Sequence, residues 1–320
     1  MKAQFISDFR TGDTIVGIFS LASRTTARKK DGSPFLRLVL ADRTGSINAV
    51  VWDDVDQAEQ ATASSPFVHI KGDVSQYRDA HQLTVKTIKP CDPDTVDPAD
   101  FLPVTEKDVN AMFRRMLAIT REMRSEDIKA LLEQFWTDDA FVEEQFKRSP
   151  AAKMMHHAYL GGLLEHTLAV AELALVVADR YSEKLDRDML VAGAILHDIG
   201  KTREFVYDYR IDYSDEGRLL GHIVMGMNMV DEKLALLQGF PREKAMLVKH
   251  MIASHHGNRE LGSPEPPKTL EAMVLNHIDE MDSKVTGIHD FMAGHEAGQS
   301  WTGFHRPMER FFYIGGKKAD

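Results

Sequence analysis

The residues best suited to chemistry are histidines and aspartates that interrupt apolar stretches in the second half of the chain. The clearest example is GAILHDIGK, residues 193–201, where a run of small and apolar residues ends in His197 and Asp198 side by side. Imidazole nitrogens and carboxylate oxygens are the donors that hold first-row divalent metals. The same residue types recur near the ends of other apolar, helix-like stretches, and the full candidate set is His166, His197, Asp198, His222, His255, His256 and Asp279.

Each of these residues, taken singly, has a structural explanation. A lone histidine beside an apolar face is more often a hydrogen-bonded core or capping residue than a ligand, and Asp198 could simply precede a helix end at Gly200. Burying the whole set without a cation would cost on the order of several kcal/mol in lost hydration. A metal site therefore explains the set better than separate structural roles do.

The elements that must position these residues change character near residue 92. Before it, apolar and polar residues alternate in five short runs, at residues 14–25, 35–45, 46–54, 67–77 and 82–90. Five short strands in a segment of this size favour a small closed barrel. The acidic, proline-rich residues that follow are typical of a linker, and from residue 104 the pattern is helical almost to the end. We predict a multi-domain α and β protein: an N-terminal β-barrel (1–92), a linker with connecting helices (93–149) and an all-α domain with a C-terminal tail (150–320).

The predicted barrel has features of a nucleic-acid-binding domain. Four cations lie between its first two strands, and aromatic residues are scattered through the strands; single-stranded nucleic acid is held by such combinations. Alternatively, the aromatics are core and the cations lie on a solvated loop, and for the cations the two interpretations weigh equally. The segment resembles the OB-fold family, with residues 35–53 matching its second and third strands, although OB folds also bind oligosaccharides and proteins. The four cations are Arg24, Arg28, Lys29 and Lys30.

Composition excludes other classes of protein. The net charge of −10 argues against coating nucleic acid by charge alone, yet residues 1–95 are neutral, so the barrel is the better docking site for a polyanion. A single cysteine, Cys91, excludes an internal disulfide framework. No apolar run has the length of a membrane span and the N-terminus lacks a secretory pattern, so we expect a cytoplasmic protein.

The ordered set H…HD…H…HH…D resembles the HD-domain superfamily of metal-dependent phosphohydrolases over residues 150–290. The chain as a whole is similar to the bacterial 3′-5′ exoribonucleases of the YhaM type. The features that carry this resemblance are the OB-like barrel and the stretches HHAYLGGLLEHTLAVAELA and ILHDIGKTREF. The resemblance implies hydrolysis of single-stranded RNA to 5′-mononucleotides. It assigns one metal to His166, His197, Asp198 and Asp279, and a second to Asp198 as a bridge with His222, His255 and His256.

One or two ions per chain are compatible with this set. Manganese is favoured because the exoribonuclease resemblance implies it, while iron, cobalt and nickel suit the same donors. Asp198 is expected to be essential for catalysis, and the resemblance favours a phosphate contact for Lys201 over a solvated cation at a helix end. Candidates for weaker substrate contacts are Arg218, Lys284 and His157, the last with an equally weighted structural role. No residue stands out as the general acid.

Other functions fit part of the same pattern. HD domains also cleave nucleotides and cyclic nucleotides, but a small-nucleotide hydrolase has no evident use for a single-strand platform. Single-stranded DNA is an alternative polymer, because nothing in the sequence identifies a contact with a 2′-hydroxyl. A non-catalytic nucleic-acid-binding adaptor is the third alternative, against which the completeness of the ligand set argues. The resemblance further implies a homo-oligomer, and the lack of a long apolar run leads us to expect no membrane partner.

Overall fold

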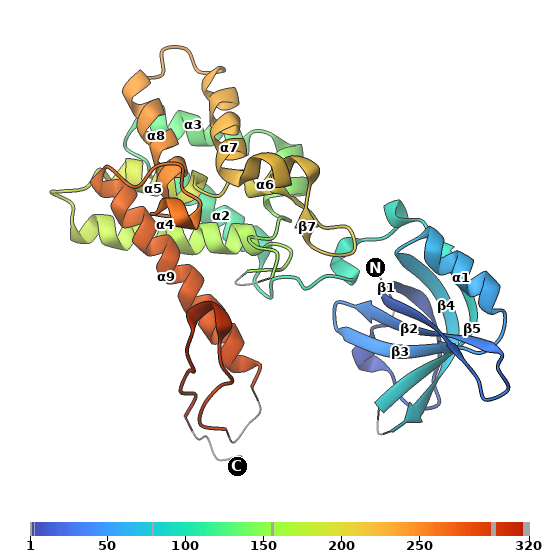
Figure 1. The fold of residues 1–320 in the computed structure, drawn as a ribbon. Helices are drawn as coiled ribbons and strands as arrows, with labels where there is room; N and C mark the ends of the chain where they lie inside the picture. The colour runs from blue at the N-terminus through green and yellow to red at the C-terminus, as the bar shows by residue number, and fades with distance from the viewer. Residues whose placement is uncertain (1, 3, 79, 155–156, 296–298, 316–320) are drawn as a thin grey trace. The chain divides into compact units, whose positions relative to one another are not determined.

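The computed structural model describes residues 2, 4–78, 80–154, 157–295 and 299–315. It divides into two compact units: residues 1–104 with 206–212, and residues 105–205 with 213–320. In Figure 1 the first unit is rich in strands, drawn in blue and teal, and the second is helical. The predicted fold class, a small barrel followed by a helical domain, is confirmed. Within the segment expected to be a linker, residues up to 104 belong to the barrel unit.

The barrel is a closed sheet with the strand order β1-β2-β3-β5-β4. Only β3 and β5 pair in parallel, and the other neighbouring strands are antiparallel. The five predicted strands are all present, and a helix that the sequence analysis did not predict stands between the third and the fourth. The elements are β1 (Thr14–Arg28), β2 (Pro34–Asp42), β3 (Gly45–Val51), α1 (Val55–Ser64), β4 (Phe67–Tyr77) and β5 (Ala80–Cys91), after the short 3-10 helix η1 (Ile6–Asp8).

Alternation along the strands places one face of each in the barrel core. In β2, Leu36, Leu38 and Leu40 are buried, while Arg37 between them is exposed. Phe19 and Phe67 are fully buried, as the core interpretation of these aromatics expects. The aromatic residues therefore divide between the core and the surface, where Trp52 and Tyr77 are exposed.

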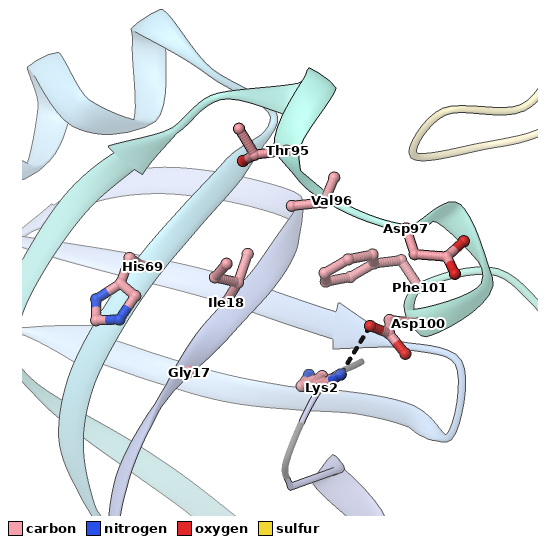
Figure 2. Close-up of a pocket in the computed structure, with 9 residues that line it drawn as sticks. All are labelled: Lys2, Gly17, Ile18, His69, Thr95, Val96, Asp97, Asp100 and Phe101. Carbon is pink, nitrogen blue, oxygen red and sulfur yellow. Dashed lines mark hydrogen bonds between the residues drawn. The ribbon is translucent and has the colours of Figure 1, made fainter.

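The start of the chain packs against the residues that follow the last strand of the barrel (Figure 2). The Lys2 ammonium donates to Asp42 Oδ2 at 2.6 Å and lies 3.9 Å from the centre of the Phe19 ring. The Lys2 backbone amide donates to Asp100 Oδ2 at 2.8 Å, and Phe101 is buried beside it. The 3-10 helices η2 (Pro93–Thr95) and η3 (Pro98–Asp100) border a cavity of about 290 Å³ here. These contacts make residues 93–101 part of the barrel unit.

The second unit is a bundle of helices around one apolar core. None of the helices in the described part of the chain has the length and apolar character required to cross a membrane. Two short strands, β6 (Phe205–Val206) and β7 (Asp212–Tyr213), pair with each other; Phe205 and Tyr213 belong to this unit, and residues 206–212 to the first. The helices are α2 (Val109–Arg121), α3 (Glu126–Trp136), the π-helix η4 (Phe141–Phe146), α4 (Gly162–Arg180), α5 (Arg187–Leu196), α6 (Lys201–Glu204), α7 (Asp215–Leu234), α8 (Arg242–Ser254), η5 (Arg259–Leu261), α9 (Leu270–Ala293) and η6 (Arg306–Met308).

Helix α5 lies at the centre of the bundle and contacts α3, α4, α8 and α9. Asp186 caps its N-terminus by accepting from the Met189 backbone amide, and nearly all of its residues are buried. Gly193 lets α8 approach closely, because a Cβ atom there would lie 2.3 Å from Met251 Cε. The end of this helix is therefore surrounded on several sides by other helices, and His197 and Asp198 are found there.

A prediction concerns Gly72, which stands at an irregularity in the pairing of β4 with β5. A Cβ atom at this position would lie 2.5 Å from the Thr84 carbonyl oxygen of β5, a backbone atom that cannot turn aside. We expect Gly72→Ala to lower the free energy of unfolding of the barrel by about 1–3 kcal/mol. Urea unfolding followed by tryptophan fluorescence measures the change. The control is Gly17→Ala on β1, where the added carbon would contact only Phe19 at 3.5 Å; equal stability of both variants would contradict the prediction.

Candidate metal centre

The seven predicted ligands come from five helices and lie in one cluster. His166 is on α4, His222 on α7 and Asp279 on α9, while His197 and Asp198 follow the last residue of α5. His255 and His256 follow the last residue of α8 in the same way. All except His222 and His256 are buried, and those two are half-buried. The structure thus brings together every member of the predicted set.

One half of the cluster surrounds His166. Its Nε2 lies 3.2 Å from His197 Nε2, 3.2 Å from Asp279 Oδ1 and 3.5 Å from Asp198 Oδ2. His197 Nε2 lies 3.4 Å from the same Asp198 oxygen. Two imidazole nitrogens and two carboxylate oxygens therefore face a common point.

The other half surrounds the second oxygen of Asp198. His222 Nε2 and His255 Nε2 each lie 3.5 Å from Asp198 Oδ1, and His256 Nε2 lies 3.2 Å from His222 Nε2. The two carboxylate oxygens of Asp198 thus face different sets of histidines. This is the arrangement that a carboxylate bridging two cations requires.

The donor set fits a cation on a further observation. Among the described residues, Asp198 Oδ1 and His255 Nε2 are buried side-chain atoms that have no hydrogen-bond partner. Buried polar atoms are nearly always paired, so two unpaired donor atoms that face each other are compatible with a bound cation. Nitrogen-rich sites completed by oxygen suit first-row divalent metals.

The outer ring nitrogens of four histidines are held by acceptors. His197 Nδ1 donates to the Ala194 carbonyl at 2.9 Å, and His255 Nδ1 to the Ile252 carbonyl at 2.8 Å. His166 Nδ1 lies 2.8 Å from Asp282 Oδ2, and His222 Nδ1 lies 3.2 Å from Glu204 Oε1. Metal-ligating histidines almost always have such a partner, which directs the other nitrogen to the ion.

Sequence reasoning missed both of these carboxylates. Asp282 stands three residues after Asp279, a spacing that places both on one helix face, and this was a usable signal. Glu204 lies in KTREF without any such spacing, so its role appears only when α6 and α7 are seen together. A cluster of metal ligands and its supporting groups are therefore not equally visible in a sequence.

The charges of the cluster are strongly coupled. Burial disfavours a charged imidazole, but Asp279 and Asp282 outweigh it and raise the pKa of His166 to about 9. Burial and the neighbouring His255 lower the pKa of His256 to about 3. Burial would raise the pKa of Asp198, yet the Lys201 ammonium holds it well below its usual value. Without a cation, His166 is charged at neutral pH while His256 is neutral.

A cavity of about 620 Å³ opens beside the cluster and is bordered by Asp279 and His256. Two of the predicted substrate contacts line it: Lys201, whose Nζ donates to Asp198 Oδ2 at 2.6 Å, and Lys284. Arg218 is exposed on α7 and is not among the described residues that line the cavity.

His157 lies next to Asp282. It is buried, and its Nε2 lies 3.2 Å from Asp282 Oδ2, the oxygen that also faces His166. Its Nδ1 lies 2.9 Å from the Tyr159 hydroxyl. Since His157 contacts Asp282 and does not line the cavity, its position suits the structural alternative better than a substrate contact.

The predicted cations of the barrel are largely held by the barrel itself. Arg24 Nη1 donates to the Glu59 carbonyl and to Thr62 Oγ1, both at 3.1 Å. Arg28 donates to the Gly32 carbonyl, and Lys29 donates to the Trp52 carbonyl. Lys30 is exposed. These contacts leave fewer free cations on this connection than the sequence suggests.

A second surface of the barrel combines aromatic and basic side chains. The Phe35 and Trp52 rings stack with centres 4.7 Å apart and planes at 25°, and Trp52 and Tyr77 are 39% and 55% exposed. Arg37 and Arg78 border the same cavity of about 340 Å³. This surface, called the stacking face below, consists of Phe35, Arg37, Trp52, Tyr77 and Arg78; Phe35 itself is buried and supports the exposed Trp52 ring.

Comparison with known proteins covers nearly the whole chain. Residues 163–284 match the family described as HD domain, and residues 19–90 match the OB-fold nucleic acid binding domain family. The chain is 35% identical over 275 residues to proteins named 3′-5′ exoribonuclease YhaM from Bacillus velezensis and Bacillus subtilis, covering 86% of each sequence. It is 31% identical over 312 residues to the Geobacillus sp. protein of that name, covering 97% of this chain and 95% of the relative.

The pKa of His166 leads to a prediction about cation binding. Because that pKa is about 9, the ring holds a proton at pH 7.5 that a cation must displace. We expect the affinity for Mn²⁺ to rise by about tenfold per pH unit below pH 9, with about one proton released. Calorimetric titration in buffers of different ionisation enthalpy measures the release. Asp282→Asn, which removes a charge that raises this pKa, is expected to release fewer protons; pH-independent affinity with no proton release would contradict the prediction.

Proposed function

The chain belongs to the YhaM family of 3′-5′ exoribonucleases, and from this membership we propose that it shortens single-stranded RNA from the 3′ end at the cluster around Asp198. The observation that carries the proposal is that Asp198 faces a complete set of histidines and carboxylates with both of its oxygens. An OB barrel in the same chain suits a single-stranded polymer better than a free nucleotide.

The activity depends on a divalent metal, which the HD domain implies. We assign one ion to His166, His197, Asp198 and Asp279, and a second to Asp198, His222, His255 and His256. Manganese is the ion we favour. An ion held by these residues would neutralise charge on a phosphate oxygen and would make a bound water molecule more acidic.

The residues of the chain supply position and charge. Lys201 lines the cavity, and Asp198 raises the pKa of its ammonium despite burial, so the group stays charged and suits a phosphate oxygen. Lys284 lines the same cavity further along α9. Hydrolysis adds one water molecule: the bond between phosphorus and O3′ breaks, the released nucleotide carries a 5′-phosphate, and the shortened RNA ends in a 3′-hydroxyl.

We propose the stacking face of the barrel as the RNA platform, with Lys29 at its border and the exposed Lys30 next to it in the sequence. Strand β2 carries Phe35 and Arg37, and residues of β3 line the same cavity; in OB folds the second and third strands bind oligonucleotides. Exposed aromatic rings stack on any base, which gives affinity with little sequence preference. Lys29 Nζ lies 5.8 Å from the centre of the Trp52 ring and adds positive charge there.

The family membership also supports a homo-oligomer and a cytoplasmic location. Several apolar side chains of α9 and the following segment are exposed, among them Val285, Trp301 and Tyr313, and a second copy of the chain would cover them. RNA is the substrate we favour, with single-stranded DNA as the alternative polymer.

The direction and the metal centre are tested together. With Mn²⁺ and 5′-labelled single-stranded RNA, we expect a ladder that shortens from the 3′ end. Asp198→Ala is expected to reduce the rate by at least about a thousandfold, because it removes the shared ligand. Asp179→Ala, on the exposed face of α4, is the control. Nucleotides consumed in place of RNA would overturn the proposal, and faster degradation of single-stranded DNA would change the preferred polymer.

The platform is tested by separating binding from chemistry. We expect Trp52→Ala to raise the KM for a long single-stranded RNA by about 5- to 150-fold, since a stacked base contributes about 1–3 kcal/mol. Arg37→Ala should also raise the KM, because its guanidinium borders the same cavity. Hydrolysis of bis(p-nitrophenyl) phosphate should stay unchanged. The control is Lys86→Ala, a barrel cation that pairs with Asp73 outside the stacking face. An unaltered KM for RNA would show that the barrel binds elsewhere.

A further inference from the structure

Helix α7 is interrupted immediately before a proposed metal ligand. Gly221 has φ 71° and ψ 158°, a conformation that essentially only glycine adopts, and His222 follows it. The backbone amide of His222 donates to Glu204 Oε1 at 3.0 Å, and its ring Nδ1 lies 3.2 Å from the same oxygen. One carboxylate oxygen of α6 thus binds both the backbone and the ring of His222.

Glu204 is itself held tightly. It is buried, and its carbonyl accepts from the Ser214 backbone amide at 2.8 Å. Glycines let α6 and α7 pack without intervening side chains: a Cβ at Gly217 would lie 2.3 Å from the Glu204 carbonyl oxygen, and one at Gly200 would lie 2.0 Å from that of His222. The backbone of Glu204 is therefore fixed by the close packing of α6 against α7, and its carboxylate extends from that fixed position.

The contact determines which ring nitrogen of His222 is available. When Nδ1 carries the proton and donates to Glu204, Nε2 keeps its lone pair. That Nε2 lies 3.2 Å from His256 Nε2 and 3.5 Å from Asp198 Oδ1. The other half of the cluster has a different support, because Asp282 of α9 accepts from His166 Nδ1.

We infer that Glu204 is the positioning residue of the second ion alone, and that Gly221 makes its contact with His222 possible. The inference rests on the proposed two-ion centre and deepens it: two carboxylates on separate helices support the two ions independently. Loss of Glu204 releases the ring and the amide of His222 together, while His166, His197 and Asp279 keep their places.

The experiment titrates Co²⁺ and Mn²⁺ into the full chain and records affinity, ions per chain and the visible spectrum of Co²⁺. We expect two ions in the wild type. Glu204→Ala should keep the first ion at unchanged affinity and weaken the second by about 10- to 100-fold. Glu204→Gln keeps an accepting oxygen without charge, so its affinity for the second ion should lie between those of the wild type and of Glu204→Ala. Asp282→Asn should lower the affinity for the first ion and leave the affinity for the second unchanged.

Controls separate positioning from general damage. Glu232→Gln alters an exposed carboxylate of α7 that pairs with Arg203, and should bind both ions as the wild type does. Gly221→Ala meets no atom within 4 Å, so its effect is purely on backbone conformation; it should weaken the same ion as Glu204→Ala and serves if that variant fails to fold. The inference would be overturned if Glu204→Ala and Gly221→Ala weakened the binding of both ions equally, or if they weakened the binding of neither ion. A wild type that degrades RNA with one ion would overturn it while leaving the exoribonuclease assignment intact.

Discussion

The structure of the helical unit depends on one buried carboxylate. Asp198 has no hydrogen bond at Oδ1 within the described residues, and its Oδ2 accepts from Lys201. A carboxylate removed from water must be compensated by charge or hydrogen bonds. Helix α8 ends just before His255, and α7 is broken just before His222, so that both rings face Asp198; His166 faces it from within α4. The central position of α5 follows, because only a helix enclosed by others can deliver a residue to such a place.

The fold was largely predictable because its signals are local. Alternation in β2 and the other strands predicts the barrel, and uninterrupted helical periodicity predicts the bundle. Helix α1 was missed because it follows β3 directly and is short and weakly apolar, with Ala58 and Ala61 as its buried contacts. The linker prediction overlooked Phe101, an apolar residue within an acidic, proline-rich stretch that packs into the barrel unit.

The metal cluster was predictable in its residue types but not in its organisation. Histidines and aspartates at helix ends stand out against apolar runs, so all seven could be named. Glu204 could not, since its contact with His222 depends on the backbone break at Gly221 and on the packing of α6 against α7. On the barrel, charge alone directed attention to Arg24 and Arg28. Their hydrogen bonds to neighbouring backbone show that cations in a sequence are not necessarily free on the surface.

The ion pair between Lys201 and Asp198 affects the charge of the cluster before a metal ion binds. Together with the protonated ring of His166, the lysine places two positive charges among the carboxylates before any cation binds. The cluster is thus partly neutralised by the chain itself before an ion binds. The active fraction would then depend on the supply of metal as well as on the amount of chain.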